Sequence, residues 1–155
     1  MKRSLFFFFF TQILICQNQW LLKSINEEPI FDTKQLFYGE RMPNVVVAKD
    51  GTIVASFGKT EFVVRRSEDG GNTWGPIIKV SEGINGGGFT VDEQSGDIIA
   101  FIEEEHPPSK LKIFRSNDNG KSWKSSQIKI LPDRNGMIPS MHMNEHGITL
   151  QKGKY

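Results

Sequence analysis

The sequence contains a single cysteine among its 155 residues, Cys16, so no disulfide within the chain can stabilise it. It also lacks an excess of charge of either sign, because 19 Lys and Arg residues stand against 18 Asp and Glu residues. This balance excludes the strongly basic surface with which proteins bind nucleic acids or anionic membranes. The composition, 37% hydrophobic and 24% charged, is typical of one globular domain or a piece of one.

No apolar run is long enough for a transmembrane helix. The longest, residues 5–16, contains five consecutive phenylalanines and follows a lysine and an arginine, which is the pattern of a secretory signal peptide. We therefore expect residues 1–16 to be a signal peptide, residues 17–36 to be a lead-in, and the protein to be secreted or periplasmic. A lipid anchor on Cys16 is the less favoured alternative, because Ile15 stands where a lipoprotein signal has a small residue.

One eight-residue pattern, S-x-D-x-G-x-[ST]-W, occurs twice in the sequence. Its defined positions are Ser67, Asp69, Gly71, Thr73 and Trp74 in the first copy and Ser116, Asp118, Gly120, Ser122 and Trp123 in the second. The pattern is typical of a tight β-hairpin connection. In such a turn the aspartate accepts backbone N–H groups, the glycine supplies a positive φ, the hydroxyl closes the far side, and the tryptophan is buried against neighbouring strands.

Short runs of β-branched and aromatic residues surround both copies and predict strands, and no segment has the spacing of an amphipathic helix. The expected strands cover residues 44–48, 52–57, 61–66, 77–80, 89–91, 97–102, 110–115 and 127–131, and a third repeat begins at 138–150. Three or four strands in a repeat of about 50 residues is the period of a β-propeller blade. We therefore expect an all-β propeller fragment of about two to two and a half blades, with missing C-terminal blades or self-association covering its open faces.

Three further segments accompany the paired pattern. The segment Arg41-Met42-Pro43 resembles an R-I-P motif, residues 50–55 follow it at the usual distance, and residues 146–150 resemble a strand that opens a third blade. With these segments, residues 37–155 resemble the sialidase (neuraminidase) superfamily, whose six-bladed propellers carry the repeated pattern as the Asp-box, or BNR repeat. The resemblance implies that the Asp-boxes lie on outer hairpins away from the ligand and take no part in catalysis.

The resemblance implies a function in hydrolysing, or only binding, a terminal sialic acid or related acidic sugar of a glycan, without a cofactor or metal. The family binds the sugar carboxylate with three arginines, and uses a tyrosine nucleophile, a glutamate and an acid/base aspartate. Arg41 matches the first arginine. No aspartate stands between Phe57 and Phe62, where Glu61 is either a substitute acid/base or an exposed strand-end glutamate. The sequence thus leaves an exo-glycosidase and a non-catalytic carbohydrate-binding propeller open, and we expect no turnover by this chain alone.

Other patterns are explained more simply by structure. The segment His142–His146 spells H-x-x-E-H, an inverted zinc-protease motif, but a nearby proline and the following glycine argue against the helix that the motif needs. The glycine-rich residues 83–88 are expected to form a loop between blades rather than a phosphate cradle. Residues 103–106, three glutamates and a histidine, are expected to form a solvated hairpin tip rather than a calcium site.

Overall fold

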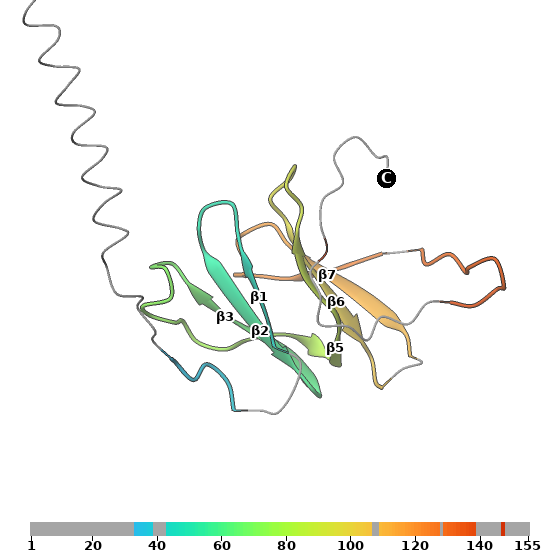
Figure 1. The fold of residues 1–155 in the computed structure, drawn as a ribbon, viewed down its shortest axis with the longest axis horizontal. Helices are drawn as coiled ribbons and strands as arrows, with labels where there is room; N and C mark the ends of the chain where they lie inside the picture. Colours follow the sequence, from blue (N-terminus) through green and yellow to red (C-terminus); the bar gives the residue numbers. More distant parts are fainter. Residues whose placement is uncertain (1–32, 39–42, 107–108, 128, 139–146, 148–155) are drawn as a thin grey trace, which may run out of the picture. The chain divides into compact units, whose positions relative to one another are not determined.

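The computed structural model describes residues 33–38, 43–106, 109–127, 129–138 and 147. Nearly all of these belong to one compact unit, Gln35–Tyr155. Every regular element among the described residues is a strand (Figure 1), so the expected all-β class is confirmed for this part of the chain. The strands are β1 (Asn44–Val47), β2 (Ile53–Gly58), β3 (Glu61–Ser67), β4 (Ile78–Glu82), β5 (Ile84–Val91), β6 (Ile98–Glu103), β7 (Leu111–Ser116) and β8 (Lys124–Ser126).

The strands form two four-stranded antiparallel sheets, and corresponding strands of the two sheets pair in the same register. The first sheet has the order β1-β2-β3-β4 and the second the order β5-β6-β7-β8, so each is a meander in which sequence neighbours pair. Ile53 pairs with Ser67 in the first sheet, Ile98 pairs with Ser116 in the second, and the following five pairs run in step. The sequence repeat is therefore also a structural repeat, and residues of one sheet have counterparts in the other.

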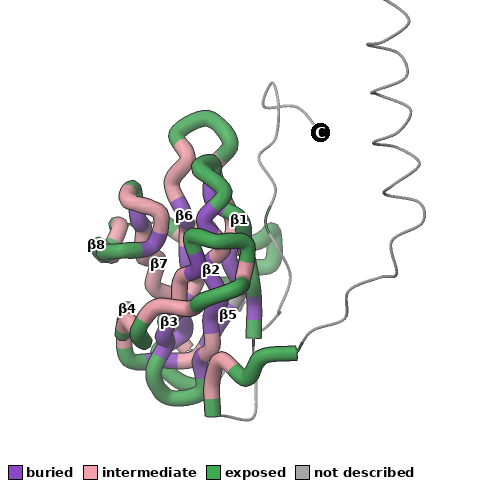
Figure 2. Tube along the Cα trace, turned by 90° about the vertical axis from the view of Figure 1, so that its left-hand side faces the viewer, coloured by how far each residue is buried: buried purple, intermediate pink, exposed green. Residues whose placement is uncertain are grey.

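The hydrophobic core lies between the two sheets. Strand β5 contacts β1, β2 and β3, and the rings of Phe62 and Phe89 meet edge to face with their centroids 5.4 Å apart. Buried residues follow β2, β5 and β6, whereas the turns are exposed (Figure 2). The buried apolar residues of this core are Val46, Ala48, Val54, Phe62, Val64, Phe89, Ile98, Ala100 and Ile102.

The prediction that residues 83–88 form a loop is wrong. Strand β5 begins at Ile84, and its pairing with β6 is interrupted between Asn85 and Phe89, where the register shifts. A bulge accommodates the extra residues without ending the strand, and glycines are common at such positions because they have no side chain to pack.

The position predicted for the last strand, residues 127–131, is also wrong, because the structure places β8 at Lys124–Ser126. Pairing in the second sheet starts directly after the turn, with Lys124 opposite Arg115. In the first sheet the Gly75 N–H also donates to the Arg66 carbonyl, at 2.8 Å, but Pro76 follows and the ladder with β3 resumes only at Ile78. Proline has no N–H to donate to a neighbouring strand, so the second repeat, which lacks it, continues its pairing without a break.

The expected signal peptide, residues 1–16, lies outside the described residues, as does most of the third repeat. No helix among the described residues is long and apolar enough to cross a membrane.

Candidate functional site

The first Asp-box forms a self-contained turn at one end of the first sheet, here called the box end. The Ser67 hydroxyl donates to Asp69 Oδ1 at 2.8 Å and accepts the Gly71 N–H at 2.8 Å. Asp69 accepts the N–H of Thr73 at 2.8 Å and its hydroxyl at 2.6 Å. The Trp74 indole N–H donates to the Gly71 carbonyl at 3.1 Å. The carboxylate is thus occupied inside its own turn.

The second Asp-box repeats these bonds. Ser116 donates to Asp118 at 2.8 Å and accepts the N–H of Gly120 at 2.8 Å, and Gly120 has a φ of 83°. Asp118 accepts the N–H of Ser122 at 2.9 Å and its hydroxyl at 2.6 Å. The Trp123 indole donates to the Gly120 carbonyl at 3.1 Å. Because the two segments have matching residues at the same spacing, they form the same turn with the same hydrogen bonds.

Hydrogen bonds keep both Asp-box carboxylates charged. The Thr73 hydroxyl is the largest cause that lowers the pKa of Asp69 from 3.8 to about 2, followed by the Thr73 N–H. Burial alone would raise the pKa of Asp118, but the hydroxyl and N–H of Ser122 outweigh it and bring this pKa to about 2. Carboxylates with such low pKa values carry no proton near neutral pH, so neither aspartate can serve as a general acid.

The second Asp-box also joins the two sheets, a role that its sequence pattern does not reveal. Asn119, with a φ of 58°, donates its side-chain amide to Asp50 Oδ2 at 2.5 Å, and its carbonyl accepts Arg66 Nε–H at 2.6 Å. Gly120 lies so close to Val54 that a Cβ added to the glycine would be 3.2 Å from a valine methyl. The only sequence signal for this contact is the Asn-Gly pair, which is typical of left-handed turns.

The two Asp-box tryptophans have different surroundings. The Trp123 ring stacks on Phe89 with a centroid distance of 5.7 Å and packs against the core. Trp74 is also half-buried, but no aromatic ring in the described part of the chain stacks on it. Trp123 therefore connects its turn to the contact between the sheets.

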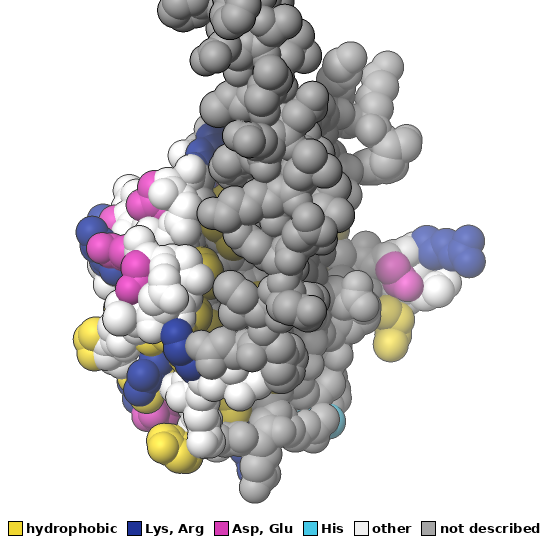
Figure 3. All heavy atoms as spheres, turned by 60° about the vertical axis from the view of Figure 1, so that its left-hand side comes forward, with side chains coloured by type: hydrophobic (Ala, Val, Ile, Leu, Met, Phe, Trp, Pro, Cys, Tyr) yellow, Lys and Arg dark blue, Asp and Glu magenta, His cyan; other side chains and the backbone are white. Residues whose placement is uncertain are grey.

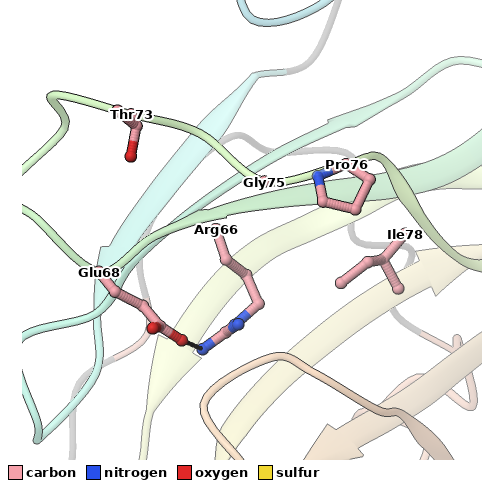
Figure 4. A pocket seen from close by; sticks show the side chains of 6 residues that line it. All are labelled: Arg66, Glu68, Thr73, Gly75, Pro76 and Ile78. Atoms are coloured by element: carbon pink, nitrogen blue, oxygen red, sulfur yellow. Dashed lines mark hydrogen bonds and ion pairs between the residues drawn. The ribbon is translucent and has the colours of Figure 1, made fainter.

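A hollow of about 280 Å³ lies beside the first Asp-box (Figure 4). Its lining residues are Arg66, Glu68, Thr73, Gly75, Pro76 and Ile78. The Arg66 guanidinium donates to Glu68 at 2.9 Å, as Figure 4 shows, and to the Asn119 carbonyl, and its side chain is only 13% exposed. Because this cation is already engaged, the hollow is a poor site for an anionic ligand.

The opposite end of the sheets, here called the loop end, consists of the connections β2–β3, β4–β5 and β6–β7. The Gly83 N–H donates to the Thr60 carbonyl at 2.8 Å. A Cβ on Gly58 would lie 3.0 Å from the backbone nitrogen of Asn85, which is itself fully buried. Connections from both sheets thus meet at this end, away from the Asp-boxes.

Glu61 lies at the loop end as the first residue of β3, and it is exposed. Its carboxylate forms an ion pair with Lys79 at 2.6 Å, and Lys79 also contacts Glu82. Glu61, and after it Glu82, raises the pKa of Lys79. Acidic and basic side chains likewise lie next to one another on the face shown in Figure 3. Glu61 is therefore engaged with a neighbouring lysine rather than directed to a site of its own.

The acidic segment 103–106 is a solvated tip only in part. Glu103 is the last residue of β6 and is fully buried, because β6 stays paired with β7 to this point. Glu104 forms an ion pair with Lys112 at 2.9 Å, which lowers the pKa of Glu104, and the two residues that follow are exposed. Among the described residues, no group of three or more His, Cys, Asp or Glu side chains could hold a metal ion.

Two predicted sites cannot be placed in this geometry. Arg41, the expected carboxylate-binding residue, and the segment His142–His146 both lie outside the described residues. In the sequence, Arg41 stands shortly before Asn44, with which β1 begins at the loop end.

Comparisons with known proteins give distant likenesses to solved structures alone. No protein-family model matches the chain, and no curated protein matches it. The solved structure of the Hadza microbial sialidase Hz136 is similar to it with 20% sequence identity and a TM-score of 0.39. The similarity covers 54% of this chain and 24% of that one, so the chain spans less than a quarter of the length of that sialidase.

Proposed function

We propose that the chain forms part of a sialidase-type β-propeller whose loop end binds the terminal acidic sugar of a glycan. The observation that carries the proposal is the repeated unit: two four-stranded meanders in one register, each with the same Asp-box turn at the same end. The carboxylates of both Asp-boxes are bonded inside their own turns, which leaves the loop end for a ligand. Because a fold alone does not determine chemistry, the choice of an acidic sugar as the ligand depends on Arg41.

Arg41 is the residue to which we assign the sugar carboxylate. It precedes β1 in the sequence, and β1 begins at the loop end. A guanidinium makes two parallel, charge-assisted hydrogen bonds to a carboxylate, whereas two of the lysines near the loop end, Lys79 and Lys112, already have acidic partners. The proposal therefore predicts selectivity for an acidic sugar over a neutral one.

Binding without hydrolysis is the form of this function that the described residues favour. The β2–β3 connection contains only Lys59 and Thr60, so it offers no aspartate as acid/base, and the nearby Glu61 is paired with Lys79. A glycosidase needs one carboxyl group that can give a proton to the leaving oxygen. Hydrolysis would require further blades that supply this group and a nucleophile.

The test is to titrate the purified chain with an α-linked sialoside and with the matching neutral galactoside, measuring binding by ligand-observed NMR. We expect binding of the sialoside only, and a loss of about tenfold or more in the Arg41→Ala variant. Arg134→Ala removes the same charge at an exposed position and should bind normally. Equal binding of both sugars, or equal loss in both variants, would refute the proposal.

A second assay separates binding from hydrolysis. A fluorogenic sialoside should give no turnover above buffer with this chain. If the unmodified chain does hydrolyse the sialoside, the Glu61→Gln variant identifies the acid. Hydrolysis that persists in this variant would show that another residue is the acid, and hydrolysis that is lost would show that Glu61 is catalytic. Either outcome would overturn the non-catalytic form of the proposal.

A further inference from the structure

The hollow beside the first Asp-box lies where the pairing of β3 with the following segment is irregular. The Gly75 N–H donates to the Arg66 carbonyl at 2.8 Å. Regular pairing resumes with Ile78 opposite Val64, so two residues, one of them a proline, stand opposite the single residue 65 of β3. An extra residue of this kind is a β-bulge, which disrupts the ladder and bends the strand. The bulge therefore shapes one wall of the hollow.

The second repeat has the same Asp-box turn but no such bulge. Lys124 lies opposite Arg115, Ser125 opposite Phe114, and the next pair follows without a shift. The hollow is therefore not a consequence of the Asp-box itself, because it depends on a feature in which the two repeats differ. Bulges are common next to binding sites, where they change the direction of side chains.

One wall of the hollow is a fixed pair of opposite charges. Arg66 donates to Glu68 Oε1 at 2.9 Å and to the Asn119 carbonyl at 2.6 Å, which uses two of the five N–H groups of its guanidinium. The Glu68 side chain is 64% exposed, and among the described residues no donor bonds its second oxygen, Oε2. Because the two charges form a pair, a ligand with a charge of either sign would lose hydration without gaining a new counter-ion.

The other wall is apolar. Figure 4 shows the Pro76 ring and the Ile78 side chain across the hollow from the Arg66–Glu68 pair. The volume, about 280 Å³, lies just below the range of about 300–1,000 Å³ that is usual for small-molecule sites. The hollow therefore suits one uncharged side chain that has a polar end and an apolar stem.

We propose that the hollow binds the side chain of a glutamine residue presented by another polypeptide. A primary carboxamide carries its acceptor oxygen and one N–H on the same edge, next to each other. The oxygen accepts from the Arg66 guanidinium, the N–H donates to Glu68 Oε2, and the two methylene groups contact Pro76 and Ile78. This site is separate from the sugar site proposed at the loop end and does not depend on it.

The test compares three blocked amino acids, the N-acetyl N-methylamides of glutamine, glutamate and methionine, as ligands in ligand-observed NMR. All three share the backbone amides and have side chains of similar length, so a difference between them reports the side-chain end group. We expect binding of the glutamine compound only, because glutamate places a second carboxylate beside Glu68 and methionine lacks both hydrogen bonds.

Three variants locate the binding. Glu68→Ala removes the acceptor and should weaken binding about tenfold. Gly75→Leu should abolish binding by filling the hollow; its Cβ would lie 3.5 Å from the Arg66 carbonyl oxygen, an ordinary contact, and its backbone is not left-handed. Glu105→Ala removes the same charge from an exposed position at the loop end and should bind normally. Circular dichroism checks that each variant folds, and if one does not, the other decides.

Every other result overturns the proposal. Equal binding of the methionine compound would show an apolar contact without recognition of the amide, and no binding of any compound would show that the hollow takes no side chain of this kind. Binding that persists in Glu68→Ala and Gly75→Leu would place the ligand elsewhere. The sugar site fails separately, since Arg41→Ala should leave glutamine binding unchanged and Glu68→Ala should leave sialoside binding unchanged.

Discussion

Adding one methyl group to the second Asp-box should test the contact between the sheets directly. In Gly120→Ala the new Cβ would lie 3.2 and 3.3 Å from the two methyls of Val54 and 3.6 Å from Arg66 Cδ. Val54 is fully buried, and a β-branched side chain has few alternative rotamers, so it cannot move aside. Gly71→Ala is the matched control, because its Cβ would meet only Ile53 Cδ1, at 4.0 Å.

The two variants share the cost of backbone strain and differ in how crowded the new methyl group is, so the difference in their stability loss reports the crowding. Both glycines have a positive φ, 83° and 92°, which costs a residue with a side chain about 1–2 kcal/mol. Both substitutions also lower the conformational entropy of the unfolded chain by the same amount, so this contribution cancels when the two variants are compared. Crowding in the core adds about 1–3 kcal/mol for Gly120→Ala alone. We therefore expect about 1–2 kcal/mol of destabilisation at Gly71 and about 2–5 kcal/mol at Gly120.

Urea denaturation followed by circular dichroism measures both free energies of unfolding. The midpoint should fall further for Gly120→Ala, without a change in slope, since the surface exposed on unfolding stays the same. Equal midpoints for the two variants would refute the reasoning, because they would mean that only backbone strain matters and that the second Asp-box does not press on the first sheet.

Two further predictions concern the Asp-box side chains. Trp123→Ala should cost about 2–4 kcal/mol because its ring stacks on Phe89, and Trp74→Ala should cost less; a larger loss for Trp74 in denaturant titrations would contradict the core contact. Because the folded pKa values of Asp69 and Asp118, about 2, lie below 3.8, their stabilisation is present above pH 3.8 and is lost as the pH falls toward 2. The denaturation midpoint should fall over that range, and a variant with both aspartates changed to asparagine should show a smaller fall.

The sequence predicted the strands and turns that depend on local chemistry. The Asp-box turn could be derived residue by residue, since all its bonds join groups within eight positions, as from Ser67 to Trp74. Short runs of β-branched and aromatic residues placed six of the strands closely. The prediction failed for β8 and for the start of β5, where a proline-free turn and a bulge decide the pairing.

The candidate site was predicted less completely. Glu61 was found at the loop end, but its partner Lys79 stands 18 positions away in the sequence, and nothing in the local pattern joins them. The burial of Glu103 was missed because a run of glutamates has the composition of a solvated loop. Charge patterns predict where acidic groups occur, and packing decides which of them reach solvent.

The sequence by itself thus determined most of the repeated unit: six of the eight strands, the turn and the residues that close that turn. Only the tertiary structure decided how the two units meet, through Asn119 with Asp50 and Arg66, and through Trp123 on Phe89. The physical reason is distance along the chain. Hydrogen bonds within a turn depend on neighbouring residues alone, whereas a contact between residues 69 positions apart exists only after both sheets have formed and packed.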